Sequence, residues 1–203
     1  MTDRLFAAVF PPAETLEALE RLAGPRCDAT LGWRWTRPAN WHLTLAFFGD
    51  VADDRQEPLI EALAEVAASA GAFRLTVGGA GLFGKAKPRA AQSLLAKALW
   101  MGARAGGAEL AALSARVRQA SSRVGVHPDG SKFTAHLTLA RATRPAPARG
   151  LLNAVESFGD FDFAVSEFLL VKSTLAPSGS SYQPVCGFQL APLAVRAPEP
   201  PQP

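Results

Sequence analysis

The chain has 203 residues, 48% of them hydrophobic and 19% charged, with a formal net charge of +3 and a pI near 9.2. This length and apolar content indicate a globular protein with a sizeable core. No apolar run reaches the length of a membrane span, the short apolar start ends at Pro11-Pro12, and the two cysteines are far apart. We therefore expect a cytoplasmic protein with no membrane association, and its mild basicity suits a phosphate-bearing partner.

Apolar or alternating runs along the chain predict strands. The expected strands cover residues 4–10, 33–37, 41–48, 73–83, 93–101, 133–140, 161–175 (as one or two strands) and 182–190. Periodic segments, several with proline or acidic residues in the first turn or glycine beyond the end, predict helices. The expected helices cover residues 11–22, 53–70, 109–123 and 149–157, and a proline-broken loop is expected at 144–148.

One five-residue sequence occurs twice, because His-Leu-Thr-Leu-Ala stands at 42–46 and again at 136–140. Successive strand side chains point to opposite faces, so the His and Thr of each copy share one face while the leucines anchor the other face to a core. If the two strands lie side by side, two imidazoles and two hydroxyls converge. That set suits a phosphate, with one imidazole to donate a proton, one to accept a proton, and hydroxyls for the oxygens.

A common spacing supports an internal duplication, since Phe6 precedes His42 by 36 residues and Trp100 precedes His136 by 36 residues. Each half follows the order strand, helix, strand, helix, strand. We expect an α+β fold with two pseudo-symmetric lobes, each a mainly antiparallel sheet with flanking helices, and an active-site groove between them. Residues 1–195 would form this single bilobal domain, and 196–203 a disordered tail. A doubly wound parallel sheet is disfavoured because glycine-rich phosphate loops are absent.

Three stretches, at 35–45, 133–141 and 170–182, carry a resemblance to a known family. Together they resemble the 2H phosphoesterase superfamily, named for its two His-x-Thr-x motifs, and within it the RNA 2′,3′-cyclic phosphodiesterases, historically called 2′-5′ RNA ligases. Two departures stand out. Ala135 occupies a position where the family usually has proline, and a basic insertion at 84–92 has no assigned role.

The resemblance implies roles for the repeated residues. His42 would donate a proton to the 3′ oxygen of a cyclic phosphate, and His136 would accept the proton of the attacking water, giving a 2′-phosphomonoester. Thr44 and Thr138 would hold the non-bridging oxygens, and no metal or cofactor would be needed. Arg141 would supply a fixed positive charge, although strand alternation places it on the site's face only if the strand ends or bulges there.

Three aromatic residues are candidates for stacking on the terminal base. Phe48 shares the face of His42 by alternation, and Phe133 and Tyr182 are the others, although each taken alone also suits a core position. The four tryptophans are assigned to packing. His127 is expected to be a turn residue, and a metal site built from His42 and His136 is disfavoured because no third ligand stands at a helpful spacing.

Several functions remain open at this point. The first is hydrolysis of RNA 2′,3′-cyclic phosphate ends by a monomeric enzyme. The same site could instead join RNA ends through a 2′-5′ linkage, because the same groups serve both directions. A non-catalytic module that binds RNA ends is a third reading, and a small cyclic nucleotide as substrate is a fourth.

Overall fold

The computed structural model describes residues 1–27, 32–85, 94–176 and 179–192. The strands of this part are β1 (Thr2–Val9), β2 (Arg34–Trp35), β3 (Leu43–Ala52), β4 (Phe73–Phe83), β5 (Leu95–Ala105), β6 (His136–Pro147), β7 (Phe161–Val165), β8 (Glu167–Ala176) and β9 (Gly179–Gln189). The helices are α1 (Ala13–Cys27), α2 (Asp53–Ala68), α3 (Gly107–Arg123) and α4 (Arg149–Glu156), with a short 3-10 helix η1 (Pro38–Asn40). The predicted tail at 196–203 and most of the basic insertion lie outside the described residues.

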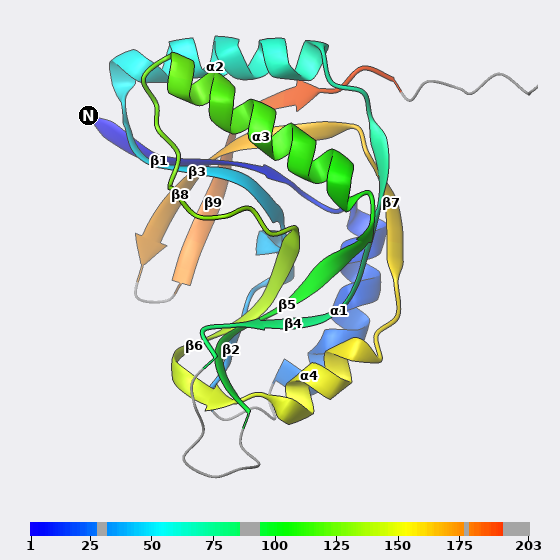
Figure 1. Ribbon diagram of the computed structural model, residues 1–203. Coiled ribbons are helices and arrows are strands. Elements are labelled where there is room, and N and C mark those ends of the chain that lie inside the picture. Colours follow the sequence, from blue (N-terminus) through cyan, green and yellow to red (C-terminus); the bar gives the residue numbers. More distant parts are fainter. Residues whose placement is uncertain (28–31, 86–93, 177–178, 193–203) are drawn as a thin grey trace, which may run out of the picture.

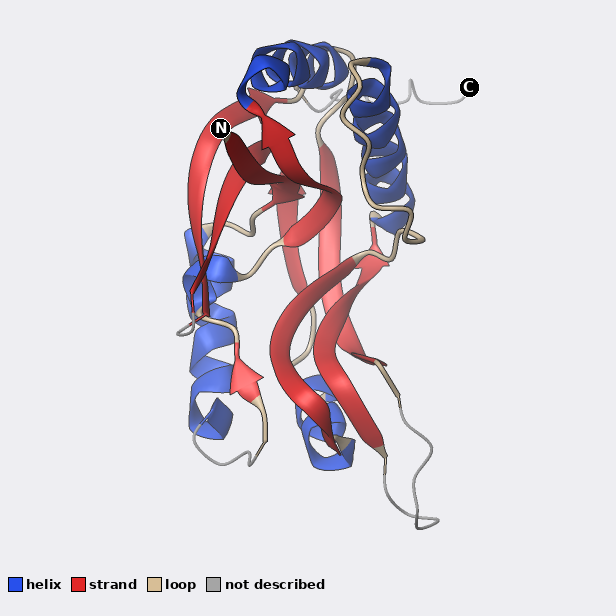
Figure 2. Ribbon diagram, turned by 90° about the vertical axis from the view of Figure 1, so that its left-hand side faces the viewer, coloured by secondary structure: helices blue, strands red, loops and turns tan. Residues whose placement is uncertain are grey.

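All strands belong to one antiparallel sheet with the order β7-β4-β5-β6-β3-β1-β8-β9, and β2 pairs with β6. Its two halves meet where β3 and β6 pair through one pair of residues, Leu43 and Leu137. Helices α2 and α3 pack over the half that contains β3, and α4 packs over the half that contains β6 (Figure 1). The second view shows the same division, with α2 and α3 at one end of the molecule and α1 and α4 at the other (Figure 2). We call these halves the β3 lobe and the β6 lobe. The expected two-lobed α+β fold is confirmed.

The leucines of the repeated sequence anchor both lobes to the main core. Leu43, Leu45, Leu137 and Leu139 are each at most 1% exposed. Burying a leucine side chain contributes about 1.5–3 kcal/mol, so these four residues fix the face that each strand turns inward. The opposite face of the β3 lobe carries a smaller apolar cluster centred on Phe6, whose partly buried members include Tyr182.

Both copies of the repeat contain a β-bulge at the same place. In the β1–β3 pair, Ala7 is opposite Ala46 and Ala8 is opposite Thr44, so Leu45 has no partner. In the β5–β6 pair, Leu99 is opposite Ala140 and Trp100 is opposite Thr138, so Leu139 has none. An extra residue shifts the alternation of faces by one. Consecutive residues Leu45 and Ala46, and likewise Leu139 and Ala140, are therefore all buried.

The strand β6 continues to Pro147, where the sequence predicts a loop at 144–148. Its last part pairs with β5, with Ala146 opposite Ala96 and Pro147 opposite Leu95. The short β2 pairs with β6 at Ala140 and Arg141, so among the described strands none pairs with the far side of β6 near the prolines. A proline is tolerated where its missing N–H is not needed by a neighbouring strand.

No helix of the described residues is long and apolar enough to cross a membrane.

Candidate active site

The pairing between the lobes brings the two His-Thr pairs together. Because Leu43 lies opposite Leu137 in an antiparallel pair, His42 falls opposite Thr138 and Thr44 falls opposite His136. All four side chains are partly exposed, whereas the leucines between them are buried. The face that each strand turns away from the core therefore presents two imidazoles and two hydroxyls at the junction of the lobes.

Each imidazole is oriented by its own backbone. The Nδ1–H of His42 donates to the carbonyl oxygen of Asn40, and the Nδ1–H of His136 donates to that of Thr134, each at 2.7 Å. A carbonyl oxygen only accepts, so Nδ1 carries the hydrogen in both rings. Nε2 is then the atom left to exchange a proton with a substrate, as a base in the neutral ring and as an acid in the charged ring.

His42 lies among three aromatic rings. The centroids of Phe6 and Phe10 are 5.0 and 5.5 Å from its ring, and Tyr182 meets it edge-on at 5.3 Å. Tyr182 comes from β9, so the predicted contact residue reaches the site from the far edge of the sheet. These rings exclude water from most of the imidazole.

The pKa of His42 is strongly lowered by these surroundings. Burial, which penalises the charged ring, is the main cause of a fall from 6.5 to about 4. The hydrogen bond to the Asn40 carbonyl opposes this fall, while the charges of Arg141 and His136 add to it. A pKa this low makes His42 neutral at neutral pH when no anion lies beside it.

His136 has a related but more open environment. Phe83 meets its ring edge-on at 4.9 Å, and the Trp100 ring lies 6.0 Å away. Burial again lowers its pKa, with the Thr134 carbonyl opposing and the charge of Arg141 adding to the effect. A neutral ring at neutral pH suits a proton acceptor.

Arg141 reaches the site because of the bulge at Leu139. Its Nη2 lies 3.5 Å from Oγ1 of Thr138, and it lines the same groove as His42. The condition that the sequence set for Arg141, a bulge or a strand end before it, is met. The positive charge of this guanidinium contributes to lowering the pKa of both imidazoles.

A groove beside His42 has a volume of about 760 Å³. Its lining comes from β2, η1, the residues between β2 and β3, β6 and β9, namely Arg34, Trp35, Thr36, Arg37, Asn40, His42, Thr138, Arg141, Ala142, Thr143, Gly179, Ser180 and Tyr182. Among the described residues that line it, none is acidic. The described lining residues therefore offer a ligand positive formal charge and neutral hydrogen-bonding groups.

The prediction that Phe48 faces the site is wrong. Phe48 is 7% exposed and belongs to the main core, because the bulge at Leu45 reverses the alternation beyond it. Phe47 takes the opposite face and packs with the cluster around Phe6. Phe133 packs against the main core, and nothing places it against either histidine.

The aromatic neighbours of the histidines are the residues that sequence reasoning missed. The sequence alone does not single out Phe10 or Phe83, and it assigns Trp100 to packing. The spacing of 36 residues that links Phe6 to His42 and Trp100 to His136 is the signal it offers, since both ring pairs are in contact.

Asn40 joins two elements of the site. Its backbone oxygen accepts the bond from His42, and its side-chain Nδ2 donates to the Ser180 oxygen at 2.9 Å. One residue of η1 thus orients a histidine and ties it to β9, which carries Tyr182.

The third histidine, His127, lies exposed in the loop before β6, as predicted for a turn residue.

Within the described part of the chain, no three His, Cys, Asp or Glu side chains form a cluster that could hold a metal ion. At the junction of the two lobes the chain brings together two imidazoles, two hydroxyls and a guanidinium, groups that are able to exchange protons and to bind an anion.

Comparisons with known proteins agree with this class of site. The profile of the LigT like Phosphoesterase family matches residues 9–91 and 102–182. An RNA 2′,3′-cyclic phosphodiesterase of Aquifex aeolicus is 28% identical, over 92% of this chain and 97% of the relative. One of Geobacillus stearothermophilus is 29% identical over 91% of this chain, which spans 56% of that relative's length. The crystal structure of E. coli LigT complexed with 3′-AMP superposes with a TM-score of 0.69 and 26% identity, covering 94% of this chain and 99% of LigT.

The chain belongs to the LigT-like phosphoesterase family. The resemblance to 2H phosphoesterases that the sequence indicates is therefore confirmed.

Proposed function

We propose that this protein hydrolyses the 2′,3′-cyclic phosphate at RNA ends to a 2′-phosphomonoester, with two histidines as acid and base and without a metal ion. The observation that supports the proposal is the antiparallel pairing of Leu43 with Leu137, next to which both strands carry an imidazole oriented by a backbone carbonyl. The names of the family relatives, RNA 2′,3′-cyclic phosphodiesterases, support the substrate class.

The proposed reaction is one displacement at phosphorus. Nε2 of His136 takes a proton from water, and the water oxygen forms a bond to phosphorus. The bond between phosphorus and the 3′ oxygen breaks, and Nε2 of His42 gives its proton to that oxygen. The products are a 2′-phosphomonoester and a 3′-hydroxyl, and exchange with solvent returns both rings to their starting states. Thr44, Thr138 and Arg141 would stabilise the charge that develops on the non-bridging oxygens.

The lowered pKa of His42 fits the role of an acid that is charged only when substrate is present. A phosphate anion beside Nε2 favours the imidazolium, so substrate binding raises the pKa of His42. The proton then sits on a ring in dry surroundings, which hold it weakly and release it readily to a leaving oxygen. The assignment of His42 as donor and His136 as acceptor follows the family resemblance.

The direct test is turnover of an oligonucleotide with a 2′,3′-cyclic phosphate end in the presence of EDTA, followed by phosphorus NMR. We expect a 2′-phosphomonoester product at an unchanged rate. Loss of turnover on chelation, or a 3′-phosphate product, would contradict the proposal. Binding with strong salt dependence but no turnover would support an RNA-end-binding module instead.

Alanine substitution tests the two histidines separately. We expect His42→Ala and His136→Ala each to lower kcat by about 100-fold or more, the usual effect of removing a general acid or base. His127→Ala, in the exposed loop, is the matched control and should retain the wild-type rate. A near wild-type kcat for either substituted site histidine would remove it from the mechanism.

End joining through a 2′-5′ linkage would use the same groups, with an RNA 5′-hydroxyl in place of water. Water at about 55 M competes strongly with such a hydroxyl in an open groove, so hydrolysis is the favoured direction. Incubating cyclic-phosphate and 5′-hydroxyl fragments together and searching for joined product decides between the two.

A further inference from the structure

Strand β3 pairs with β6 at Leu43 alone, and helix α3 with the segment after it occupies the edge of β3 beyond that point. Ser114 of α3 is fully buried, and its Oγ donates to the carbonyl oxygen of Leu45 at 2.6 Å. Further along β3, the carbonyl oxygen of Phe47 accepts from the backbone N–H of Asp129 at 2.9 Å. Two carbonyl groups of β3 are therefore satisfied at this edge without a strand partner.

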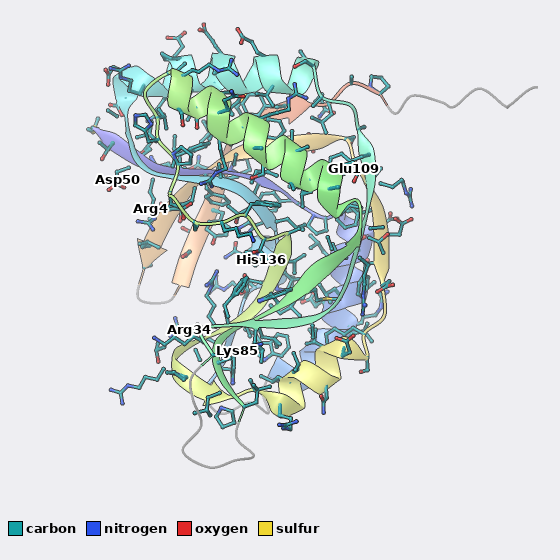
Figure 3. All side chains as sticks on the ribbon, in the orientation of Figure 1. Arg4, Arg34, Asp50, Lys85, Glu109 and His136 are labelled. Atoms are coloured by element: carbon teal, nitrogen blue, oxygen red, sulfur yellow. The ribbon has the colours of Figure 1, made fainter. Side chains whose placement is uncertain are left out.

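Asp129 belongs to the segment that connects α3 to β6, residues 124–135, which crosses from the β3 lobe to the β6 lobe. It leaves the end of α3 and runs down past β3 to the start of β6 (Figure 1). Figure 3 shows the labelled His136 where this segment meets β6, below α3 in that view. All residues of the segment are described and none belongs to a helix or a strand, so its path depends on side-chain and loop contacts.

Arg118 holds the middle of this segment to α3. It lies one helical turn beyond Ser114, so both side chains leave the same face of the helix. Its Nη2 donates to the carbonyl oxygen of Asp129 and lies 3.5 Å from that of Ser131, while its Nη1 lies 3.5 Å from Oδ1 of Asp129. The hydroxyl of Ser131 donates to the same Oδ1 at 2.9 Å. The guanidinium therefore binds a closed turn through two oxygens of one residue, a geometry that fixes both partners.

The turn that Arg118 holds lies close to the carbonyl that orients His136. Two residues separate Ser131 from Thr134, whose carbonyl oxygen accepts from Nδ1 of His136 at 2.7 Å. The strand that follows is fixed by its pairing, since His136 lies opposite Gly102 of β5. The backbone before it is not part of a described strand, so the position of the Thr134 carbonyl depends on where the turn is held.

We propose that Arg118 is a positioning residue for His136, which acts by keeping the Thr134 carbonyl in place. This inference rests on the proposed function, in which Nε2 of His136 takes a proton from water. An imidazole whose Nδ1 has lost its acceptor can turn, and it can carry its hydrogen on either nitrogen. A neutral ring with the hydrogen on Nε2 cannot accept a proton there, so loss of the tie lowers the fraction of reactive rings.

The experiment compares Arg118→Ala with Arg116→Ala, because α3 offers a matched arginine. Arg116 donates from Nη1 to the carbonyl oxygen of Ser69 at 3.1 Å and from Nη2 to that of Val66 at 3.2 Å. It therefore also ties α3 to a neighbouring backbone, but at the C-terminal end of α2 rather than in the segment that leads to His136. The two substitutions remove the same charge and similar hydrogen bonds.

For Arg118→Ala we expect kcat on a cyclic-phosphate-ended oligonucleotide to fall by about 10- to 100-fold, because a misplaced general base reacts slowly. KM should change by less than about twofold, since the binding groups are unaltered. Arg116→Ala should keep the wild-type kcat, even where it lowers the thermal midpoint as much as Arg118→Ala does.

Nitrogen-15 NMR of the neutral His136 ring gives a second readout, which a general loss of stability does not move. The hydrogen should sit on Nδ1 in the wild type and in Arg116→Ala, and both tautomers should appear in Arg118→Ala. If Arg118→Ala does not fold at the assay temperature, Arg118→Lys takes its place under the same criteria, since an ammonium does not reproduce the planar fork that binds Asp129.

Several results would overturn the inference. They are a wild-type kcat for folded Arg118→Ala, a His136 ring that keeps its hydrogen on Nδ1 in that variant, and an equal loss of kcat in both arginine variants. A higher KM at an unchanged kcat would also overturn it, because that result would assign Arg118 to contact with the substrate.

Failure of the proposed function has a different signature. Wild-type protein that cleaves no cyclic-phosphate substrate refutes the proposed reaction, whatever the variants do. The tautomer of His136 is measured without turnover, so the NMR comparison then decides alone. Mixed tautomers in Arg118→Ala but not in Arg116→Ala support the positioning role, and the same tautomer in both variants overturns it.

Discussion

His42 and His136 share one arrangement of hydrogen bonds but differ in their surroundings. Each Nδ1 is held by a carbonyl two residues earlier, which fixes the ring and leaves Nε2 available. Three rings close around His42, whereas His136 is flanked by Phe83, which is 36% exposed, and by Trp100. Two copies of one sequence thus acquire different proton affinities from the residues that pack on them.

The pKa of His42 should be measurable by histidine NMR. Without ligand we expect a pKa far below 6.5, near 4, because burial disfavours the charged ring. Saturation with inorganic phosphate or a 2′-nucleotide should raise it, because the anion stabilises the imidazolium. The signals of His127, in its exposed loop, should not respond to the ligand. An unliganded pKa of 6.5 or above would show that the aromatic rings do not exclude water from His42.

Gly81 on β4 is a positioning residue for His136. A Cβ atom at this position would overlap with the ring of Trp100, which stacks over the glycine and lies against His136. We expect Gly81→Ala to displace Trp100, to destabilise the fold by about 1–3 kcal/mol and to lower kcat. Because burial lowers the pKa of His136, moving the indole away should raise that pKa.

The control for this substitution is Gly150→Ala in α4, where an added Cβ meets nothing within 4 Å. Thermal unfolding, kcat and the NMR titration of His136 should all separate the two variants. Equal behaviour would show that Trp100 does not set the environment of His136.

For single residues, the sequence correctly predicts the strand face of the repeated His and Thr side chains. They all point away from the buried leucines, and they are His42, Thr44, His136 and Thr138. It does not predict which rings surround the histidines. Those contacts depend on neighbouring strands far along the chain, and single-strand alternation carries no information about them.

At the level of the strands, the two bulges decide which residue after each repeat lies on the same face as the histidine. The bulge at Leu45 removes Phe48 from the site, and the equivalent bulge at Leu139 brings Arg141 into it. The local pattern of apolar residues cannot show a bulge, because it arises from the register with a partner strand. From the sequence we can infer that Arg141 faces the site only if a bulge or a strand end precedes it, but not whether such a bulge exists.

The junction between η1 and β9 depends on the side chain of Asn40. Asn40→Ala removes the donor to the Ser180 oxygen but leaves the backbone oxygen that orients His42. We expect a loss of about 1 kcal/mol in the free energy of unfolding and a fall in kcat/KM, because β9 carries Tyr182 to the histidine. Asn40→Asp should reproduce the loss, since a carboxylate accepts and does not donate.

Asn153→Ala, an exposed asparagine of α4, is the matched control for Asn40→Ala. Chemical unfolding and steady-state kinetics on a cyclic-ended substrate give the two readouts. If both asparagine variants behave alike, the bond to β9 contributes nothing to the site.

For the whole molecule, the two histidines make stability depend on pH. Well above pH 6.5, the pKa of an unfolded histidine, both are neutral in the folded and unfolded states and add no pH dependence. As the pH falls from 6.5 toward 4, the unfolded chain takes up protons that buried His42 does not, and stability falls. Between pH 6.5 and 5 we expect His42 to contribute about 1–2 kcal/mol of this loss.

Replacing His42 with glutamine, which does not titrate, should flatten the pH dependence in this window. Urea unfolding at pH 7.5, 6.5, 5.5 and 5, in buffers without phosphate, provides the measurement. Parallel curves for wild type and His42→Gln would contradict the lowered pKa.

The sequence predicts the two-lobed architecture better than any other feature, because the repeat and the spacing of strands and helices indicate two similar halves. It does not predict that the halves share one sheet, because the pairing of β3 with β6 joins residues 94 positions apart, Leu43 and Leu137.

The single pair of Leu43 and Leu137 sets the spacing between the two strands that carry His42 and His136. The separation of the two Nε2 atoms therefore depends on the aliphatic packing of these leucines in the core. Shortening the side chain of either leucine would loosen that packing. The distance between the two Nε2 atoms would then vary more, while most of each lobe stayed intact. In this architecture, the relative position of the two imidazoles depends on hydrocarbon contacts in the core, which a substrate does not touch.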